Sequence, residues 1–382
     1  MVPRVKVGIV GTGFIARGLL LALDSQPDLI VAKVLTRRNP DDCKEFPAPE
    51  RLTTSIQQFL SCSELIVECS GDVLHATEVI AQAFEAALPV ITMNAEVQVT
   101  TGSYLASRGF LTEAEGDQPG CLAALKENVE AMGFHPLVYG NIKGFLNLNP
   151  TLEEMQYWSK RNGISLQMVT AFTDGTKVQI EQALVANGLG AGIAKAGLLG
   201  LEAEDVHAGG AAIAAEASKL GRPLSDYLLA PKAPPGIFIT AGHDSRQQEA
   251  LSYFKLGKGP HYTLLQNYHL CHLEILKTIR RVLNGGGILL NNSTSPSISV
   301  AAIAKRVIPA GTHVEKAIGS FDFRGIAIER AADPDHVPIG LLCQAVITRA
   351  IEPGQAVRYN DVELPDSLAL RACLDIRKAG AP

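Results

Sequence analysis

The chain has 382 residues and a formal net charge of −5 at pH 7, from 34 Lys and Arg against 39 Asp and Glu. This length exceeds what a single hydrophobic core usually supports, so we expect two or three domains. The slightly acidic balance, without blocks of like charge, argues against nucleic acid and membrane surfaces as main partners. Apolar residues make up 47% of the chain but are interrupted throughout, and no run reaches the ~18 residues that a membrane span requires.

The cysteines and the first residues favour a cytoplasmic protein. Seven cysteines, an odd number without a C-x-x-C pair, indicate reduced thiols rather than a disulfide framework. The opening sequence MVPRVKVGIVGTG enters a strand at once, so we expect no signal peptide.

A nucleotide-binding pattern opens the chain. Residues 4–10 form a predicted strand, and the turn GTGFIA that follows has the order G-x-G-x-x-A. Gly11 permits the tight turn, Gly13 lets the backbone approach a pyrophosphate, and Ala16 lets the next helix pack on the strand. The helix N-terminus offers free N–H groups to the phosphates, although such turns also serve ordinary strand-to-helix packing. The cofactor-binding residues expected here are Gly11, Thr12, Gly13, Phe14 and Ile15.

The end of the second predicted strand indicates which nicotinamide cofactor binds. Residues 29–38 end where dinucleotide folds place the residue that contacts the adenosine ribose. An acid there favours NAD, whereas this chain has Arg37 and Arg38. Guanidinium groups bind a 2′-phosphate through forked, charge-assisted hydrogen bonds. We therefore expect NADP, with NAD possible, and the alternative is two solvated arginines in a turn.

Strands and helices alternate up to residue 94. Predicted helices near 53–61 and 74–87 alternate with predicted strands at 64–71 and 89–94. This alternation predicts an α/β fold with a doubly wound parallel sheet, a Rossmann domain, whose ligands lie beyond the carboxyl ends of the strands. Candidates for lining the cofactor there are Cys69, Ser70, Gly71, Asn94 and Ala95, and Glu96 is a substrate-binding candidate unless it only starts a helix.

Two polar segments follow in the middle of the chain. The loop EAEGDQPG at 113–120 can present backbone N–H groups to a ligand, although turn composition explains it nearly as well. The strand in FHPLVYGNIKGFLNLNPT contains Gly140, and a glycine in a strand often marks close approach by another backbone or a ligand. The site candidates in these two segments are Asp117, Gln118, Asn141 and Lys143.

The segment AFTDGTKVQIEQALVANGLG, residues 171–190, carries charges although it is otherwise composed for burial. Asp174, Lys177 and Glu181 have the spacing i, i+3 and i+7, so on one helix they would share a face. Such charges usually belong to a solvated helix face. The neighbouring sequence has too few charges for a surface helix, so we expect these side chains to point into a cleft.

A buried lysine suits the chemistry of hydride transfer. Hydride cannot leave an alcohol carbon, or reach a carbonyl carbon, unless the oxygen loses or gains a proton, so such a site needs a positioned acid/base. We expect Lys177 to be this group, with Asp174 and Glu181 supporting it. Lys143 is a candidate for a second cation that polarises a carbonyl or binds a substrate phosphate or carboxylate.

These motifs together resemble a known family. The Rossmann opening, VITMNAE, GDQPG, GNIKGFLN, FTDGTKVQIEQALVANG and YHLCHLE are similar to homoserine-dehydrogenase-like oxidoreductases with a C-terminal SAF domain, a group that includes the 1-deoxy-D-xylulose 5-phosphate reductoisomerase-like proteins. The resemblance spans essentially the whole chain and implies NAD(P)-dependent hydride transfer on a small polar, hydroxylated compound. Asp174 and Lys177 match the acid and lysine of the family. The resemblance also places Glu96, Lys143, Glu181 and Asn187 at the site.

One departure from this family concerns the substrate. Homoserine dehydrogenases have an asparagine-glycine-threonine turn after the corresponding strand, whereas here Asn147 is followed by Leu148. Homoserine is therefore not the substrate that the sequence favours.

The segment YHLCHLEILKTIRRVL at 268–283 predicts an amphipathic helix. His269 and His272 are three residues apart with Glu274 nearby, but the H-E-x-x-H order is missing and no third ligand is evident. We expect no metal site here. His269 is instead a candidate for contacting the substrate, and the alternative is a pair of satisfied core histidines.

The C-terminal region predicts a small β domain. Residues 291–297 form a predicted linker, after which KRVIPAGTHV and TRAIEPGQAV repeat at an offset of 43 residues. This duplication matches Ile308 with Ile351 and Gly311 with Gly354, and it suggests a barrel-like module that resembles a SAF domain. The module could cap the active site, serve assembly or be purely structural.

The sequence thus predicts three consecutive domains. These are an NADP-binding Rossmann domain at 1–148, an α+β catalytic and dimerisation domain at 149–290, and a SAF-like domain at 291–382. The predicted function is NADP-dependent hydride transfer to or from a polyol, sugar, sugar phosphate or hydroxy acid, in a homodimer or higher homo-oligomer. Two alternatives are a reductoisomerase of a ketose phosphate and a non-catalytic NADP sensor that acts through the SAF-like domain.

Overall fold

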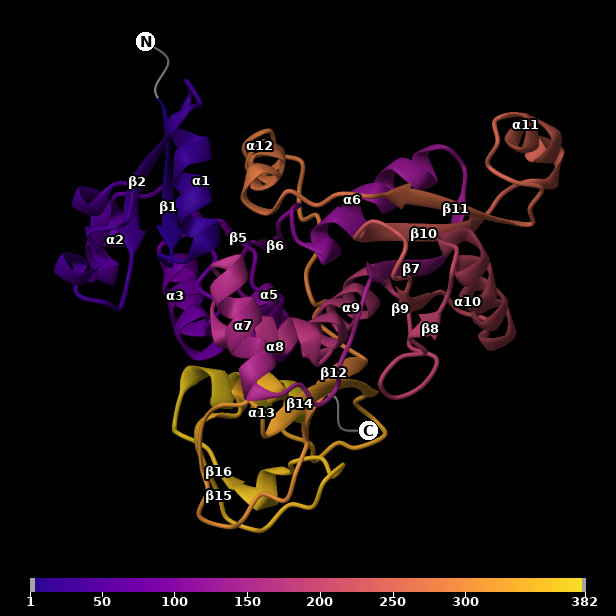
Figure 1. Ribbon diagram of the computed structural model, residues 1–382. Helices are drawn as coiled ribbons and strands as arrows, with labels where there is room; N and C mark the ends of the chain where they lie inside the picture. Colours follow the sequence, from indigo (N-terminus) through magenta and orange to yellow (C-terminus); the bar gives the residue numbers. More distant parts are fainter. Residues whose placement is uncertain (1–3, 380–382) are drawn as a thin grey trace. The chain divides into compact units, whose positions relative to one another are not determined.

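The computed structural model describes residues 4–379, which divide into two compact units (Figure 1). The first unit contains the described parts of 1–120, 269–294 and 367–382, and the second contains 121–268 and 295–366. Both units are therefore discontinuous in sequence and cut across the three consecutive domains that the sequence predicts. The physical reason is that two late segments of the chain pack on the N-terminal Rossmann fold.

A six-stranded parallel sheet forms the centre of the first unit and confirms the predicted Rossmann fold. The sheet has the order β3-β2-β1-β4-β5-β6, the order of dinucleotide-binding folds. Its β-branched strands are buried on both faces, as expected for a parallel sheet. The strands are β1 (Val5–Val10), β2 (Leu29–Leu35), β3 (Leu52–Thr53), β4 (Leu65–Glu68), β5 (Val90–Thr92) and β6 (Leu111–Glu113).

Helices from distant parts of the chain complete this unit. Helix α1 (Phe14–Asp24) shares a hydrophobic cluster with α12 (Ile275–Leu283), and α13 (Leu368–Ala379) packs against α3 (Val73–Glu85) and α5 (Ser103–Ala106). Burying these apolar faces stabilises the unit and draws 269–294 and the C-terminal helix to it. The shorter elements are α2 (Ile56–Ser61), α4 (Ala95–Val97), a π-helical turn at Gln98–Gly102 and 3₁₀ turns at Pro40–Cys43, Pro49–Arg51 and Cys271–Leu273.

A five-stranded mixed sheet forms the centre of the second unit. Its order is β11-β10-β7-β9-β8, in which β7, β8 and β9 are parallel while β10 runs antiparallel to β7 and β11. The predicted close approach at Gly140 of β7 is to a side chain, because a Cβ there would clash with the Phe238 ring. The strands are β7 (His135–Lys143), β8 (Leu201–Glu202), β9 (Leu224–Leu229), β10 (Gly236–Gly242) and β11 (His261–Gln266).

Helices cover both faces of this sheet. Helices α6 (Gln118–Ala131) and α9 (Thr176–Leu189) contribute to a cluster on one face, and α10 (Val206–Leu220) packs on the other. The remaining helices of the unit are α7 (Leu152–Asn162), α8 (Leu166–Thr173), α11 (Gln248–Tyr253) and a 3₁₀ turn at Ser245–Gln247.

Residues 295–366, here called the β-module, form the rest of the second unit. Strand β12 (Ile298–Ala304) pairs with β14 (Phe323–Glu329), and β15 (Cys343–Ile347) pairs with β13 (His313–Lys316) and β16 (Val362–Glu363). Short 3₁₀ turns occur at Ile339–Leu341 and Tyr359–Asp361. This region confirms a separate β-rich part of the fold.

The sequence repeat has a structural counterpart in the β-module. Ile308 and Ile351 are equivalent in the repeat, and they pair with each other through two backbone hydrogen bonds of 2.9 Å. Gly311 and Gly354, also equivalent, have φ angles of +85° and +82°, a left-handed conformation that favours glycine. The two copies therefore face each other within one module.

Helix α9 lies between two β layers of the second unit (Figure 1). It packs on β7 and β9 of the five-stranded sheet and on β12 and β14 of the β-module. All residues from Thr176 to Asn187 are buried. The burial predicted for this segment from its composition is confirmed.

Candidate functional site

A cavity of about 410 Å³ opens at the carboxyl ends of β1 and β2 in the first unit. This is the edge of a parallel sheet where nucleotides bind. Its walls combine the glycine turn with the ends of three strands. The lining residues are Gly11, Thr12, Gly13, Leu35, Thr36, Arg37, Arg38, Ser70 and His75.

The glycine turn has the geometry that a pyrophosphate requires. Gly11 has a φ of +110°, and a Cβ there would lie 3.1 Å from the Cys69 carbonyl oxygen, so a larger residue would be strained. Gly13 is the N-cap of α1, and a Cβ on it would meet open space. The free N–H groups of α1 are thus accessible to an anion, which fits the phosphates of a dinucleotide. Ile15 follows in the first turn of α1, and the exposed Phe14 ring stands edge-on to His272.

Both predicted arginines line this cavity. Arg38 donates a hydrogen bond to the Thr12 hydroxyl, which ties it to the glycine turn. Arg37 forms a 2.7 Å ion pair with Asp72, the residue that caps α3 through the His75 amide. Burial, followed by the positive charge of Arg37, lowers the pKa of His75, so this ring remains neutral at physiological pH. Two guanidinium groups beside a phosphate-binding turn fit a 2′-phosphate.

The end of β4 carries a buried acid that sequence reasoning missed. Glu68 is fully buried and accepts hydrogen bonds from the Ser70 amide at 2.7 Å, the Ser70 hydroxyl at 2.5 Å and the Thr92 hydroxyl at 3.0 Å. Burial raises its pKa, and these hydrogen bonds oppose the shift. Glu68 therefore ties the end of β4 to the end of β5. Its place inside the apolar run ELIVECSG concealed it, although an acid in such a run is itself a signal.

The other candidates of the first unit lie at the ends of β4 and β5. Cys69 donates from its thiol to the Val10 carbonyl, while burial raises its pKa, and Gly71 has a φ of +65°. Asn94 caps α4 by accepting from the Val97 amide at 3.1 Å, and Ala95 and Glu96 begin this short helix as buried residues. Glu96 therefore lies at the start of a helix. This is the alternative to a substrate contact that the sequence leaves open.

The GDQPG loop and the histidine segment lie side by side in the first unit. The Gln118 amide nitrogen lies 3.4 Å from Nε2 of His269. A Cβ on Gly116 would clash with the Cys271 carbonyl oxygen, so the loop packs tightly on this segment. Asp117 is buried in the same loop.

The predicted helix at 268–283 is shorter in the structure. Cys271 has a φ of +40°, so a 3₁₀ turn precedes α12, which begins only at Ile275. The His272 ring packs within 2.5 Å of the position that a Cβ on Gly18 would take, which makes it a packing residue of α1. Within residues 4–379, no group of three or more His, Cys, Asp and Glu side chains is arranged to hold a metal ion.

In the second unit, Asp174 does not lie on the same helix as Lys177. Helix α8 ends at Thr173, Gly175 adopts a φ of +82°, and α9 begins at Thr176. The prediction that Asp174 and Lys177 share one helix face is therefore wrong. Its physical reason is the left-handed glycine, which breaks the helix between them.

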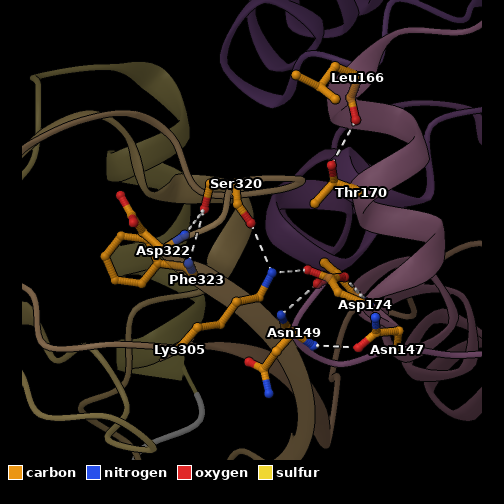
Figure 2. A network of polar contacts seen from close by, with 11 residues as sticks. Asn147, Asn149, Leu166, Thr170, Asp174, Lys305, Ser320, Asp322 and Phe323 are labelled. Carbon is orange, nitrogen blue, oxygen red and sulfur yellow. Dashed lines mark hydrogen bonds and ion pairs between the residues drawn. The ribbon is translucent and has the colours of Figure 1, made fainter. Parts of the chain in front are cut away.

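Asp174 instead forms a buried ion pair with Lys305 of the β-module (Figure 2). The Lys305 Nζ lies 2.5 Å from Oδ2 of Asp174 and donates to the Ser320 carbonyl at 2.9 Å. The other oxygen, Oδ1, accepts from the Thr176 amide at 2.9 Å. Burial raises the pKa of Asp174, and the Lys305 ammonium opposes this shift.

Three other predicted residues meet between β7 and α9. Glu181 is fully buried, and its Oε2 accepts from Asn141 Nδ2 at 2.9 Å and lies 3.4 Å from Lys143 Nζ. Lys177 is also buried and precedes Glu181 by four residues on α9, so both are on one helix face. We call Asn141, Lys143, Lys177 and Glu181 the lysine–glutamate cluster. It places two cations and one carboxylate on neighbouring elements.

Asn187 has a structural partner rather than an open side chain. Its Nδ2 donates to the Ile298 carbonyl at 2.9 Å, and its Oδ1 accepts from the amides of Ser297 and Ile298. It thus fixes the start of β12 to the end of α9. This role differs from the predicted contact with substrate.

Two family models match the chain in successive regions. The model described as homoserine dehydrogenase, NAD binding domain, matches residues 11–108, and the model described as oxidoreductase DRL, catalytic domain, matches residues 116–275. The first covers the cofactor cavity and the second covers the lysine–glutamate cluster. The chain is an NAD(P)-dependent dehydrogenase or reductase. A comparison with curated protein sequences finds no match.

Solved structures of dehydrogenases match the chain at low sequence identity and with TM-scores below 0.5. A homoserine dehydrogenase from Thiobacillus denitrificans is 12% identical, with a TM-score of 0.45 over 94% of this chain and 98% of that one. A probable dehydrogenase from Thermotoga maritima is 13% identical, with a TM-score of 0.44 over 75% and 91% of the chains. A myo-inositol dehydrogenase from Corynebacterium glutamicum ATCC 13032 is 12% identical, with a TM-score of 0.42 over 75% and 90%.

Two further predictions from the sequence concern thiols and membranes. All seven cysteines are free thiols. Among residues 4–379, no helix has the length and apolar character needed to cross a bilayer.

The raised pKa of Glu68 makes the stability of the enzyme depend on pH. Between the ordinary carboxyl pKa of 4.5 and the raised pKa, the folded state binds more protons than the unfolded state. The contribution of Glu68 to the free energy of unfolding therefore falls as the pH rises through this window, with a slope of up to about 1.4 kcal/mol for a tenfold drop in proton concentration. We expect Glu68→Gln to remove this loss of stability with rising pH, because the glutamine side chain does not titrate.

Denaturant unfolding at several pH values tests this expectation. The advantage of Glu68→Gln over the wild type should grow from acid to neutral pH, while Glu78→Gln, at an exposed position of α3, should follow the wild type. Equal pH slopes for Glu68→Gln and the wild type would contradict the assignment.

Proposed function

We propose that the protein is an NADP-dependent oxidoreductase that transfers a hydride to or from a small polyhydroxylated substrate. The observation that carries the proposal is the lysine–glutamate cluster, in which Lys177 and Glu181 are buried and Lys143 is partly buried, in the region that matches an oxidoreductase catalytic domain. Charges that are removed from water beside a packed helix are costly unless they are paired or serve a purpose.

The first unit would bind the cofactor. Gly11, Thr12 and Gly13 would hold the pyrophosphate at the start of α1, and Arg37 and Arg38 would bind the 2′-phosphate. Bound NADP would supply or accept the hydride. The neutral His75 adds no positive charge of its own to this cavity, so the two arginines would provide the discrimination between NADP and NAD.

The second unit would supply the proton chemistry. Lys177 would act as the acid/base toward the substrate oxygen, and Glu181, one turn further along α9, would orient it. Asn141 fixes Glu181 through its amide nitrogen, while its Oδ1 is buried and accepts no hydrogen bond from residues 4–379. A substrate hydroxyl or an internal water would satisfy that oxygen. Lys143 would polarise a carbonyl or bind an anionic substituent.

A second candidate function is reduction of a ketose phosphate coupled to rearrangement of its carbon skeleton. The resemblance of the sequence motifs to the 1-deoxy-D-xylulose 5-phosphate reductoisomerase-like proteins supports it. A phosphorylated substrate calls for a dense group of cations, and the cluster offers Lys143 and Lys177, so we favour the simple reaction. The oxidoreductase matches speak against a sensor without catalysis. We also propose that the protein is a homo-oligomer and that it works in the reducing environment of the cytoplasm.

Substitution of the arginines tests the cofactor. Loss of charge-assisted hydrogen bonds in Arg37→Ala/Arg38→Ala should raise the Kd for NADPH by about 10- to 100-fold, with a much smaller change for NADH. Titration of nicotinamide fluorescence measures both constants without a substrate. Arg246→Ala, at an exposed position of the second unit, is the control. An unchanged ratio of the two constants would refute the assignment to NADP.

A substrate screen tests the chemistry. Each polyol, aldose and hydroxy acid is tested beside its phosphate ester. The absorbance of the reduced nicotinamide is followed in each assay. Removing the acid/base in Lys177→Met should lower kcat by about 10²- to 10⁴-fold, with little change in the Kd for NADPH. Lys160→Met, exposed on α7, should keep wild-type rates. Equal rates in Lys177→Met would contradict its role, and turnover of phosphate esters alone would favour the second candidate.

A further inference from the structure

One lysine of the β-module forms an ion pair with Asp174, the acid that precedes α9. Lys305 follows β12, and its side chain is 5% exposed while that of Asp174 is 0% exposed. Figure 2 shows the ammonium between the Asp174 carboxylate and the Ser320 carbonyl. Both partners of the ion pair are thus removed from water and held by further hydrogen bonds.

Asp174, which is held by Lys305, in turn holds the first turn of α9. The first amides of a helix have no partner within the helix, and Oδ1 of Asp174 accepts from the first of them, Thr176 N. Lys177 is the next residue. A displacement of Asp174 would therefore move or loosen the turn that carries Lys177.

The last residue of α8, which directly precedes Asp174, is fixed to the segment that follows β7. The Asn147 amide donates to the Thr173 carbonyl at 2.8 Å, and the Asn147 side chain accepts from the Asn149 amide at 3.1 Å (Figure 2). This segment begins immediately after Lys143, the last residue of β7. Lys143 thus lies shortly before the segment that is fixed to Thr173, and Lys177 lies shortly after Asp174.

Strand β14 of the β-module binds the same helix through its outer edge. The Gly325 amide donates to the Thr176 hydroxyl at 2.9 Å, and the Ala327 amide donates to Oε1 of Gln179 at 2.8 Å. Side chains of α9 therefore accept the hydrogen bonds that a neighbouring strand would otherwise accept from β14. The β-module contacts the helix at residues before and after Lys177.

The charge of Lys305 is costly to bury unless it has a specific use. A buried ion pair contributes little net stability compared with apolar residues of the same volume, but it fixes geometry through charge-assisted hydrogen bonds. We propose that Lys305 is a positioning residue, which acts through Asp174 to hold the first turn of α9 and thereby Lys177. The β-module would then be a working part of the catalytic unit. This inference rests on the proposed function for the role of Lys177.

Three variants and one control separate positioning from general stability. Lys305→Met removes the ammonium, Asp174→Asn removes the carboxylate charge, and the double variant removes both without leaving a charge unpaired. Glu329→Gln is the matched control, because it removes a 2.7 Å ion pair to Arg222 that also links the β-module to the rest of the second unit, without touching the start of α9.

The measurements are thermal unfolding, amide hydrogen exchange of residues 174–181, the Kd for NADPH, and kcat and KM on the substrate that the screen identifies. Lys305→Met should raise the exchange rate of 174–181 at least tenfold and lower kcat about tenfold or more with KM nearly unchanged, because small misplacements of a reacting group slow chemistry. The Kd for NADPH should not change. The double variant should regain thermal stability while kcat stays low, and Glu329→Gln should match the wild type in exchange and kcat.

Two results would overturn the proposal. One is wild-type exchange of 174–181 in Lys305→Met, and the other is recovery of kcat together with stability in the double variant. If the wild type turns over no substrate, the proposed function fails, whereas the exchange measurement still decides whether Lys305 holds the helix start.

Discussion

The structure of the second unit depends on the burial of one polar helix. Helix α9 lies between two β layers, where every polar side chain must find a partner because an unpaired one costs ~1–3 kcal/mol. Gln182 donates to two carbonyls and a hydroxyl of β7 and β9, while Gln179 pairs with Gly197 and Ala327. The helix is therefore specified by these pairings rather than by an apolar stripe.

Helix α9 has both backbone partners and titratable partners. Toward the five-stranded sheet, Glu181 meets the side chains of Asn141 and Lys143. Toward the β-module, Thr176 pairs with a backbone amide and Asn187 with backbone amides and a carbonyl. Backbone partners fix position, whereas titratable partners can exchange protons, so one helix can combine a rigid support with a chemical function.

Local patterns predicted much of this organisation. The glycine turn and the alternation of elements predicted the Rossmann sheet, because short-range spacing determines both. The burial of Lys177 and Glu181 followed from the scarcity of charge around them. The sequence could not reveal that Lys305, 131 residues away, takes Asp174 as its partner, since a single glycine decides where α9 begins. The return of α13 to the first unit was hidden for a related reason, because long-range packing carries no local signal.

The central claim is that the buried ammonium of Lys177 serves the substrate oxygen. A crystal structure with NADP and a substrate bound measures this most directly. The account predicts that Nζ of Lys177 lies within hydrogen-bond distance, about 2.6–3.2 Å, of the oxygen on the carbon that exchanges hydride. A substrate bound with that oxygen against another residue, and with Lys177 directed elsewhere, would contradict it.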